Sequence, residues 1–363
     1  AAAQTRILAP PRPVTVEFRV LGEGGAPIRD LTAADVVLKV DGQVRPLRSL
    51  ELVPLDDATS GGPPVTGLPE PFATNDVPPE RRDVLLVLED DSIAPGTEKP
   101  VKAAVDVLLS ALSPRDRVGL LNIPRGGTNI GLTTNRDDIR AGIASLVGLA
   151  TRGQTTNDAR CRTVITLQAL KDLLLAVRGN PSTTIAFFSS GVAPPDTAAA
   201  VLGRSSDLCV VKPDYFDDLR DASALSRSNF YAVHVYDDTA IATPSATTEL
   251  VAGLESLAGA VGGDTIRLTT QDGLSFGRVA RETSAYYRAT FDPQPDERDD
   301  KLHRLDVSVS RRGASVRAGS TVPIARALPA TESARSPSVT DLLRTADVHR
   351  SLPLRAAAYP SRG

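Results

Sequence analysis

The sequence predicts an α/β protein in which a doubly wound parallel sheet lies between two antiparallel β segments. Between residues 81 and 285, short unbroken apolar runs alternate with stretches of helical spacing, the pattern of a parallel sheet covered by helices on both faces. Residues 13–53 and 286–322 instead alternate apolar and polar side chains, as half-buried strands do. Residues 54–80 are rich in proline and glycine, and we expect them to form a linker without regular elements.

Strands are expected in both flanking segments. In the first segment, Asp41-Gly42 is a strong hairpin signal, and the predicted strands are 14–20, 36–40 and 44–52. In the second segment they are 286–291, 302–310 and 315–321. Because each segment alone has too few strands to bury a face, the two are expected to join in one β-sandwich.

The central unit contains five predicted strands and five predicted helices. The strands are 84–88, 118–123, 184–188, 230–236 and 265–268, and the helices are 101–112, 137–147, 164–177, 249–260 and 274–285. The tail, residues 323–363, is rich in Ala, Ser, Pro and Arg, and is expected to pack loosely, with one helix at 339–345 and a further domain beyond it.

Composition excludes several classes of function. The 41 basic and 44 acidic residues give a net charge of -3, so no overall field favours nucleic acid. No stretch approaches the roughly 18 uninterrupted apolar residues of a membrane span. The opening Ala1-Ala2-Ala3-Gln4 is typical of what remains after a signal peptide is removed, which predicts an exported protein, periplasmic or extracellular. The alternative is that the first residues of the chain were removed in another way, which would leave the same Ala-rich start.

The chain has two cysteines, Cys161 and Cys209. An even count in an exported chain predicts one disulfide between them. Two unrelated buried thiols are the alternative.

Five phrases resemble bacterial von Willebrand factor A-related proteins of the exported type: GAPI at 25–28, LTAAD at 31–35, Asp41-Gly42, LAGAVGG at 257–263 and YYRATF at 286–291. Their order and spacing cover about residues 13 to 322. The resemblance implies a Rossmann-like, doubly wound von Willebrand factor A domain with flanking β structure. It also implies that the chain binds a protein partner, whose identity the sequence does not give.

The same resemblance implies a metal-ion-dependent adhesion site. In that family a divalent ion is held by an Asp-x-Ser-x-Ser loop, a Thr on a second loop and an Asp on a third. Here Asp90 and Ser92 match the first loop, with Ala94 in place of its last Ser, and Thr155 matches the second. Ser190 stands where the third loop would have Asp.

Two departures from five positions predict a degenerate site that binds Mg²⁺ weakly, since hard-cation sites gain strength from ligand number and charge. Asp91 or Glu89 is a possible substitute ligand. The alternative is that these residues only cap helices and close turns, because Asp90 and Ser92 precede a predicted helix.

An enzyme is not expected. His234, His303 and His349 fit no paired-ligand spacing, and Ser189-Ser190-Gly191 follows a strand without the G-x-S-x-G of a hydrolase elbow. Gly126-Gly127-Thr128 lacks the Lys of a phosphate-binding loop. The sequence therefore favours a non-catalytic protein-binding module, for adhesion or as an envelope scaffold. A purely structural scaffold without metal is the alternative, and a hydrolase is the least favoured.

Overall fold

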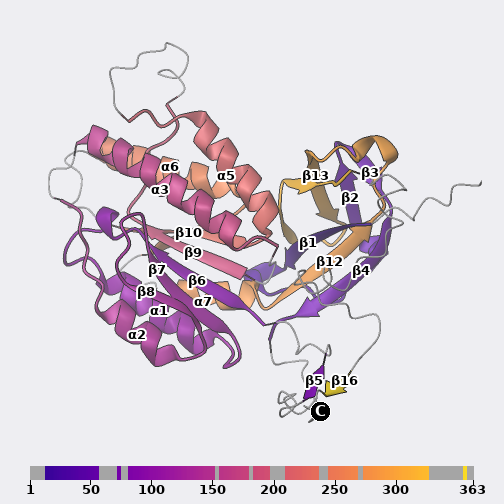
Figure 1. Ribbon diagram of the computed structural model, residues 1–363, viewed down its shortest axis with the longest axis horizontal. Helices are drawn as coiled ribbons and strands as arrows, with labels where there is room; N and C mark the ends of the chain where they lie inside the picture. Colours follow the sequence, from indigo (N-terminus) through magenta and orange to yellow (C-terminus); the bar gives the residue numbers. More distant parts are fainter. Residues whose placement is uncertain are drawn as a thin grey trace, which may run out of the picture.

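The computed structural model describes residues 13–56, 72–74, 81–151, 155–179, 183–196, 209–236, 244–268, 273–326 and 355–357. Two units lie side by side in Figure 1: an α/β unit formed by the middle of the chain and a sandwich of two antiparallel sheets formed by residues from its two sides. The doubly wound fold predicted from the sequence is confirmed.

The α/β unit is built on one six-stranded sheet. Its strands are β6 (Asp83–Leu88), β7 (Arg117–Asn122), β8 (Asn129–Thr133), β9 (Thr183–Ser189), β10 (Asn229–Val235) and β11 (Asp264–Leu268), in the order β11-β10-β9-β6-β7-β8. All neighbours are parallel except β7 and β8, which run antiparallel. The chain starts in the middle of the sheet and winds outward in both directions, so the strand order reverses between β6 and β9.

Helices cover both faces of this sheet, as Figure 1 shows. One apolar core combines residues of the sheet with residues of the helices α1 (Lys99–Ala111), α2 (Arg136–Ala144) and α7 (Gly273–Glu282). The second combines residues of the sheet with residues of α3 (Thr156–Ala176), α5 (Pro213–Ser226) and α6 (Pro244–Ala260). Since both faces are covered, β9 is buried along its whole length, which explains its unbroken apolar run.

The sandwich combines strands from both flanks of the α/β unit. One sheet has the order β14-β1-β12-β4 and the other β15-β13-β2-β3. From the N-terminal side come β1 (Val14–Leu21), β2 (Val36–Val40), β3 (Gln43–Arg45) and β4 (Leu47–Pro54), and from the C-terminal side β12 (Ala285–Phe291), β13 (Leu302–Val309), β14 (Ser315–Ala318) and β15 (Thr321–Pro323). Residues such as Phe18, Leu38 and Phe291 fill the space between the sheets and are almost fully buried.

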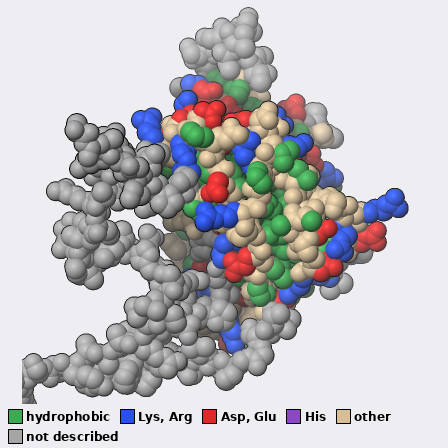
Figure 2. Space-filling model, turned by 90° about the vertical axis from the view of Figure 1, so that its right-hand side faces the viewer, with side chains coloured by type: hydrophobic (Ala, Val, Ile, Leu, Met, Phe, Trp, Pro, Cys, Tyr) green, Lys and Arg blue, Asp and Glu red, His purple; other side chains and the backbone are tan. Residues whose placement is uncertain are grey.

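The face of the sandwich that points away from the α/β unit is mixed in character. Figure 2 looks onto this end of the molecule and shows hydrophobic, acidic and basic side chains interspersed over it. Val37 and Val44 are exposed large hydrophobic residues of β2 and β3. Among the described residues, no helix is long and apolar enough to cross a bilayer.

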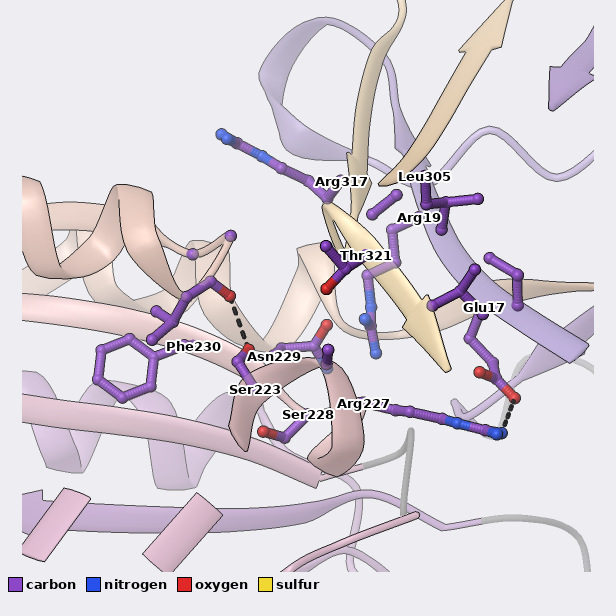
Figure 3. A pocket seen from close by; sticks show the side chains of 18 of the residues that line it. Glu17, Arg19, Ser223, Arg227, Ser228, Asn229, Phe230, Leu305, Arg317 and Thr321 are labelled. Atoms are coloured by element: carbon purple, nitrogen blue, oxygen red, sulfur yellow. Dashed lines mark hydrogen bonds and ion pairs between the residues drawn. The ribbon is translucent and has the colours of Figure 1, made fainter. Parts of the chain in front are cut away.

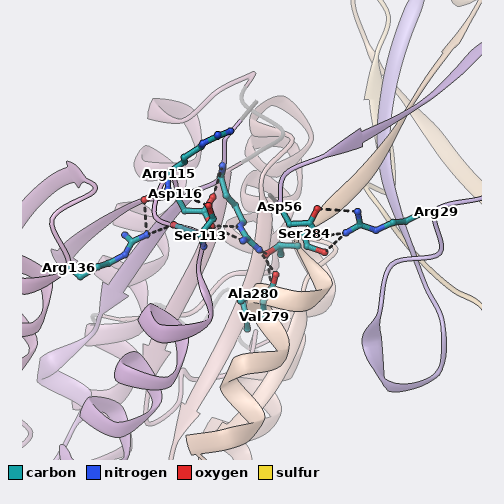
Figure 4. A network of polar contacts seen from close by, with 11 residues as sticks. Arg29, Asp56, Ser113, Arg115, Asp116, Arg136, Val279, Ala280 and Ser284 are labelled. Atoms are coloured by element: carbon teal, nitrogen blue, oxygen red, sulfur yellow. Dashed lines mark hydrogen bonds and ion pairs between the residues drawn. The ribbon is translucent and has the colours of Figure 1, made fainter. Parts of the chain in front are cut away.

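A polar network, buried at Arg82 and Asp116 and half-buried at Arg29 and Asp56, joins the two units at the amino ends of β6 and β7 (Figure 4). Arg82 pairs with Asp116 at 2.7 Å, and it also donates to the carbonyl of Ala280 and to the hydroxyl of Thr283 at the end of α7. Beside it, Arg29 binds Asp56 and the Ser284 hydroxyl. This network fixes the point at which α7 leads into β12.

Several elements differ from the sequence-based expectation. The helix predicted at 164–177 begins eight residues earlier, and both α5 and the edge strand β8 were not predicted. The expected linker contains a short strand, β5 (Phe72–Thr74), paired with β16 (Arg355–Ala357) of the tail, so the expectation of no regular element there was wrong. The helix expected at 339–345 lies outside the described residues.

Candidate functional site

The candidate site lies where the strand order reverses, between the carboxyl ends of β6 and β9. In open α/β sheets the crossovers leave such a point toward opposite faces, and ligands bind in the crevice that this creates. The loops after β6, β7 and β9 meet here. They carry four of the five predicted metal ligands and the flanking Glu89, whereas Thr155 lies at the start of α3.

Asp90 is the carboxylate at the centre of the predicted site. Its side chain is 6% exposed, and Oδ2 accepts a 2.8 Å hydrogen bond from Nδ2 of Asn122 at the end of β7. Oδ1 is buried and has no hydrogen-bond partner among the described residues. Burial raises the pKa of Asp90, and the nearby charge of Asp91 adds to this, while the hydrogen bond from Asn122 opposes it.

Ser92 and Ser190 connect the first and third loops. The Ser92 hydroxyl donates to the Glu89 carbonyl at 2.7 Å and accepts from the backbone N–H of Ser190 at 3.0 Å. Its oxygen is therefore engaged in holding the two loops together. The hydroxyl of Ser190 itself is buried and has no hydrogen-bond partner among the described residues.

Asp91 and Thr155, two of the predicted metal ligands, make other interactions instead. Asp91 forms an ion pair with Arg125 of the β7–β8 loop at 2.7 Å. Thr155 is the N-cap of α3: its hydroxyl accepts from the backbone N–H of Asp158 and donates to the carboxylate of the same residue. This capping box is the role that the alternative interpretation of the sequence assigned to such residues.

Glu89 is fully buried beneath the loops and is satisfied there. Oε1 accepts from the Thr166 hydroxyl at 2.6 Å and Oε2 from the Ser189 hydroxyl. Arg162 of α3 lies 3.4 Å from Oε1 and also donates to the Gly191 carbonyl at 3.1 Å. Glu89 therefore supports the loop after β9 and is not placed to serve as a substitute ligand.

At this edge of the sheet, three buried oxygens have no hydrogen bond within the described residues: Oδ1 of Asp90, Oδ1 of Asn122 and Oγ of Ser190. Oxygen atoms of this kind are the ligands that Mg²⁺ prefers. The described residues contain no group of three or more His, Cys, Asp or Glu side chains that could hold a metal. The donor set therefore fits a hard cation, but with one carboxylate it fits a weak site.

Exposed apolar side chains border the same edge of the sheet. Val147 and Leu149 are 60% and 53% exposed, and Tyr236, directly after β10, is 58% exposed. The loop that carries the first two is fixed against the loop after β6, because the Leu149 N–H donates to the Asp90 carbonyl at 2.8 Å. At Gly148 a Cβ atom would lie 2.3 Å from the Ile93 carbonyl oxygen, so only glycine allows this close approach.

Histidines do not complete a nucleophilic arrangement in the described part of the chain. His234 forms a hydrogen bond with the backbone of Ser190, and burial together with Arg267 lowers the pKa of His234. The Ser190 hydroxyl has no histidine partner among the described residues. His303 lies in the sandwich, between Asp41 at 2.8 Å and Asp299 at 3.0 Å.

Cys161 of α3 and Cys209 form a disulfide, with Cα atoms 4.8 Å apart. Two neighbours of Cys161 on α3 also contact the loop after β9. Arg160 lies 3.5 Å from Asp196, and Arg162 binds Gly191. The disulfide thus ties the segment before α5 to the part of α3 that supports the candidate site.

Sequence reasoning missed Asn122 and Arg162. Asn122 had a readable signal, because it is a polar residue closing an apolar strand at the sheet edge where ligands bind. Arg162 had none, since it lies in a polar stretch of sequence and meets Glu89 only through the packing of α3 on the sheet.

No protein-family model and no curated protein matches the chain. Among solved structures it is similar to an aerotolerance-related membrane protein from Bacteroides fragilis, with 13% identity, a TM-score of 0.34, and coverage of 56% of this chain and 98% of that one. It is also similar to BatB from Bacteroides thetaiotaomicron, with 12% identity, a TM-score of 0.35, and coverage of 56% and 97%. A von Willebrand factor type A protein from Catenulispora acidiphila matches with 10% identity, a TM-score of 0.37, and coverage of 90% and 77%. The last of these bears the name of the family that the sequence resembles.

Proposed function

We propose that this chain is a non-catalytic protein-binding module whose partner docks at the carboxyl edge of the six-stranded sheet. The observation that carries the proposal is the pair of buried oxygens, Asp90 Oδ1 and Ser190 Oγ, that have no hydrogen-bond partner among the described residues. A buried polar group left unsatisfied costs about 1–3 kcal/mol. A ligand that supplies the missing interactions offsets this cost at the moment of binding.

A weakly bound divalent cation is part of the proposal. Asp90, Asn122 and Ser190 are the residues that would hold Mg²⁺, which when bound offers an open coordination position to a carboxylate of the partner. Ser92 acts indirectly, by fixing the loop of Ser190 to the loop of Asp90. With one protein carboxylate the affinity for the ion alone is low, and the partner's carboxylate raises it.

The apolar border supplies the contact area that an ion-centred site lacks. Val147, Leu149 and Tyr236 are exposed around the edge, and Tyr is a residue type enriched at protein interfaces. The disulfide fits a protein that is exported to an oxidising compartment, either periplasmic or extracellular.

A metal-free structural scaffold is the second candidate function. It is favoured by the roles of Asp91, Ser92 and Thr155, which pair with Arg125, bridge two loops and cap α3. Under this alternative the orphaned oxygens are ordinary packing defects and the edge has no ligand.

Mn²⁺ binding followed by electron paramagnetic resonance separates the two candidates, because Mn²⁺ is a hard cation that reports directly on its own binding. The wild type is compared with Asp90→Asn and Ser190→Ala, and with Asp306→Asn as the matched control, since Asp306 is exposed on β13. We expect weak binding that is lost in the first variant, reduced in the second and kept in the control.

A pull-down from envelope extracts with the same proteins tests the partner. A bound protein that is released by chelator and by Asp90→Asn, but not by Asp306→Asn, supports the adhesion module. No Mn²⁺ binding and no chelator-sensitive partner supports the scaffold.

A further inference from the structure

The ion pairs of this molecule differ in whether their charges are used within the fold. In the cavity between the sandwich and the α/β unit, Glu17 of β1 pairs with Arg227, the residue after α5, at 3.3 Å (Figure 3). Asp264 of β11 pairs with Arg317 of β14 at 2.9 Å along the same seam. Each of these pairs joins the two units, so both of its charges serve the fold itself.

Arg125 is placed differently. It lies in the loop between β7 and β8, at the carboxyl edge of the sheet, and its side chain is 76% exposed. Its Nε atom lies 2.7 Å from Oδ2 of Asp91, whose side chain is only 8% exposed. Because the acid of this pair is buried and the guanidinium is at the surface, the charge that the pair presents to a partner is positive.

The burial of Asp91 anchors the exposed guanidinium. In the pair of Arg48 and Asp292, for comparison, the side chains are 60% and 53% exposed and lie 3.4 Å apart. A pair of two exposed side chains is worth little, since solvent screens the charges and both side chains lose freedom when they meet. In the Arg125 pair the carboxylate is already fixed by burial, so it holds the guanidinium at one place on the edge.

Two contacts bring Arg125 close to the candidate ion site. Asp91 follows Asp90 directly in the loop after β6, and Asn122, three residues before Arg125, donates to Asp90 at 2.8 Å. Since neighbouring Cα atoms are about 3.8 Å apart, the guanidinium lies within about 10 Å of the Cα atom of Asp90. In an extended peptide, side chains two residues apart share a face and are separated by about 7 Å. One short segment can therefore reach both positions.

The chemistry of the guanidinium decides what it binds. The group carries five N–H donors and no acceptor, and its planar fork matches the two oxygens of a carboxylate. Its closest contact with Asp91 is made by Nε, and most of the side chain is at the surface. The exposed side of the group can therefore take a second carboxylate, which comes from the partner.

We propose that Arg125 selects an acidic partner, by binding a second carboxylate of the same segment whose first carboxylate reaches the cation beside Asp90. This inference rests on the proposed function, and it adds that the partner segment carries two acidic residues close together. Arg125 is the specificity-determining residue. Asp91 is a positioning residue, because it acts by holding the guanidinium of Arg125.

Three blocked pentapeptides test this selection. One is Ac-Gly-Asp-Gly-Asp-Gly-NH₂, with two carboxylates, and the other two have Asn in place of one Asp or the other. Blocking both ends removes all other charges from the peptides. Titration calorimetry of the full chain in excess Mg²⁺ measures the three affinities. We expect the wild type to bind the two-carboxylate peptide about tenfold more tightly than either single-carboxylate peptide.

Variants of the ion pair show which residue makes the selection. Arg125→Gln should abolish the tenfold preference, and Arg125→Lys, which keeps the charge without the fork, should keep part of it. Asp91→Asn should lower the affinity for the two-carboxylate peptide alone, whereas a merely structural role would lower all three affinities equally. Arg48→Gln removes an exposed arginine of β4 and is the matched control, which should keep the full preference.

The proposal is overturned by a wild type that binds the three peptides equally or binds none of them, and by a preference that survives Arg125→Gln. The proposed function is tested separately, by Mn²⁺ binding to the wild type and its loss in Asp90→Asn. Mn²⁺ binding without the peptide preference therefore contradicts this inference alone, whereas the absence of Mn²⁺ binding contradicts both.

Discussion

At the amino ends of β6 and β7, buried charged side chains are paired, whereas at the carboxyl ends of the same strands buried oxygens have no partner in the part of the chain that the structure describes. Arg82 and Asp116 are 2% and 1% exposed and share a 2.7 Å ion pair, and Arg117 binds Asp83 at 2.6 Å. About one strand length away, Asp90 and Asn122 each leave an oxygen unsatisfied within the described residues.

This difference indicates that buried polar side chains have different roles at the two edges of the sheet. A paired charge in the interior fixes one arrangement of the elements around it, because breaking the pair leaves a charge that water cannot reach. The amino edge has to hold the sandwich in place, and Arg82 does so by reaching the end of α7. The carboxyl edge retains unsatisfied groups, at a cost in stability, where a ligand can complete them.

We expect the largest loss of stability from a substitution at the amino edge, where the buried charges are paired. Arg82→Met removes one partner of the buried pair and leaves the buried Asp116 without its ion-pair partner. We expect the free energy of unfolding to fall by about 3–5 kcal/mol in urea titrations. The double variant Arg82→Met/Asp116→Leu should recover part of this loss, since it removes the uncompensated charge. A single-variant loss below about 1 kcal/mol would show that the edges do not differ.

Removing the disulfide between Cys161 and Cys209 tests whether this bond, rather than buried ion pairs, stabilises the carboxyl edge. It joins residues 48 apart in the sequence, and closing such a loop stabilises a chain by about 2–4 kcal/mol through the entropy of the unfolded state. We therefore expect Cys161→Ser/Cys209→Ser to lower the unfolding free energy by that amount. If the edge depends on this bond, the variant should also show faster amide exchange in residues 190–196 than in residues 83–88.

His303 allows the same comparison for ion pairs that are only partly buried, because it lies between Asp41 and Asp299. Burial lowers the pKa of His303, but hydrogen bonds to Asp41 and Asp299 outweigh it and raise the pKa above 6.5. Because the folded protein binds the proton more tightly than the unfolded chain, this stabilisation is fully present below about pH 6.5 and is lost as the pH rises through the raised pKa.

We expect His303→Gln to be about 1 kcal/mol less stable than the wild type at pH 6, and equal to it near pH 9. Urea midpoints at the two pH values measure this. A difference between the two proteins that stays constant with pH would show that the ring acts by packing and not by charge.

The sequence predicted the parts of the fold that depend on burial. The apolar runs of β6 and β9 are readable because both faces of these strands are covered. The edge strand β8 is half exposed, and α5 is rich in Asp and Ser, so neither had a strong apolar period. The first turns of α3 are polar, which hid its start, although the spacing of Thr155 and Asp158 is a readable capping signal.

The site was predictable only in part. Asp90 follows a buried strand, and a position after such a strand is fixed by the sheet. Whether Asp90, Ser92 or Asp91 keeps a free oxygen depends on Asn122, Ser190 and Arg125, which come from other loops. Hydrogen bonds between segments that are distant in the sequence produce no periodic pattern, so a single sequence does not reveal them.

The smallest expected change in unfolding free energy follows from removing the Asp90 charge at the carboxyl edge. The sign of this change is the sharpest test of the contrast between the two edges. Burial raises the pKa of Asp90 above its ordinary value of 3.8, so the unfolding free energy of the wild type falls as the pH rises from about 3.8 through the raised pKa. Asp90→Asn lacks this penalty and still offers an oxygen to the Asn122 amide. We expect the variant to gain about 0.5 kcal/mol at pH 7 and to gain nothing at pH 3.5. Urea titrations at both pH values, in the presence of chelator, give the result. A loss of stability at pH 7 would mean that Asp90, like Asp116, is a structural charge, and the contrast between the two edges would then disappear.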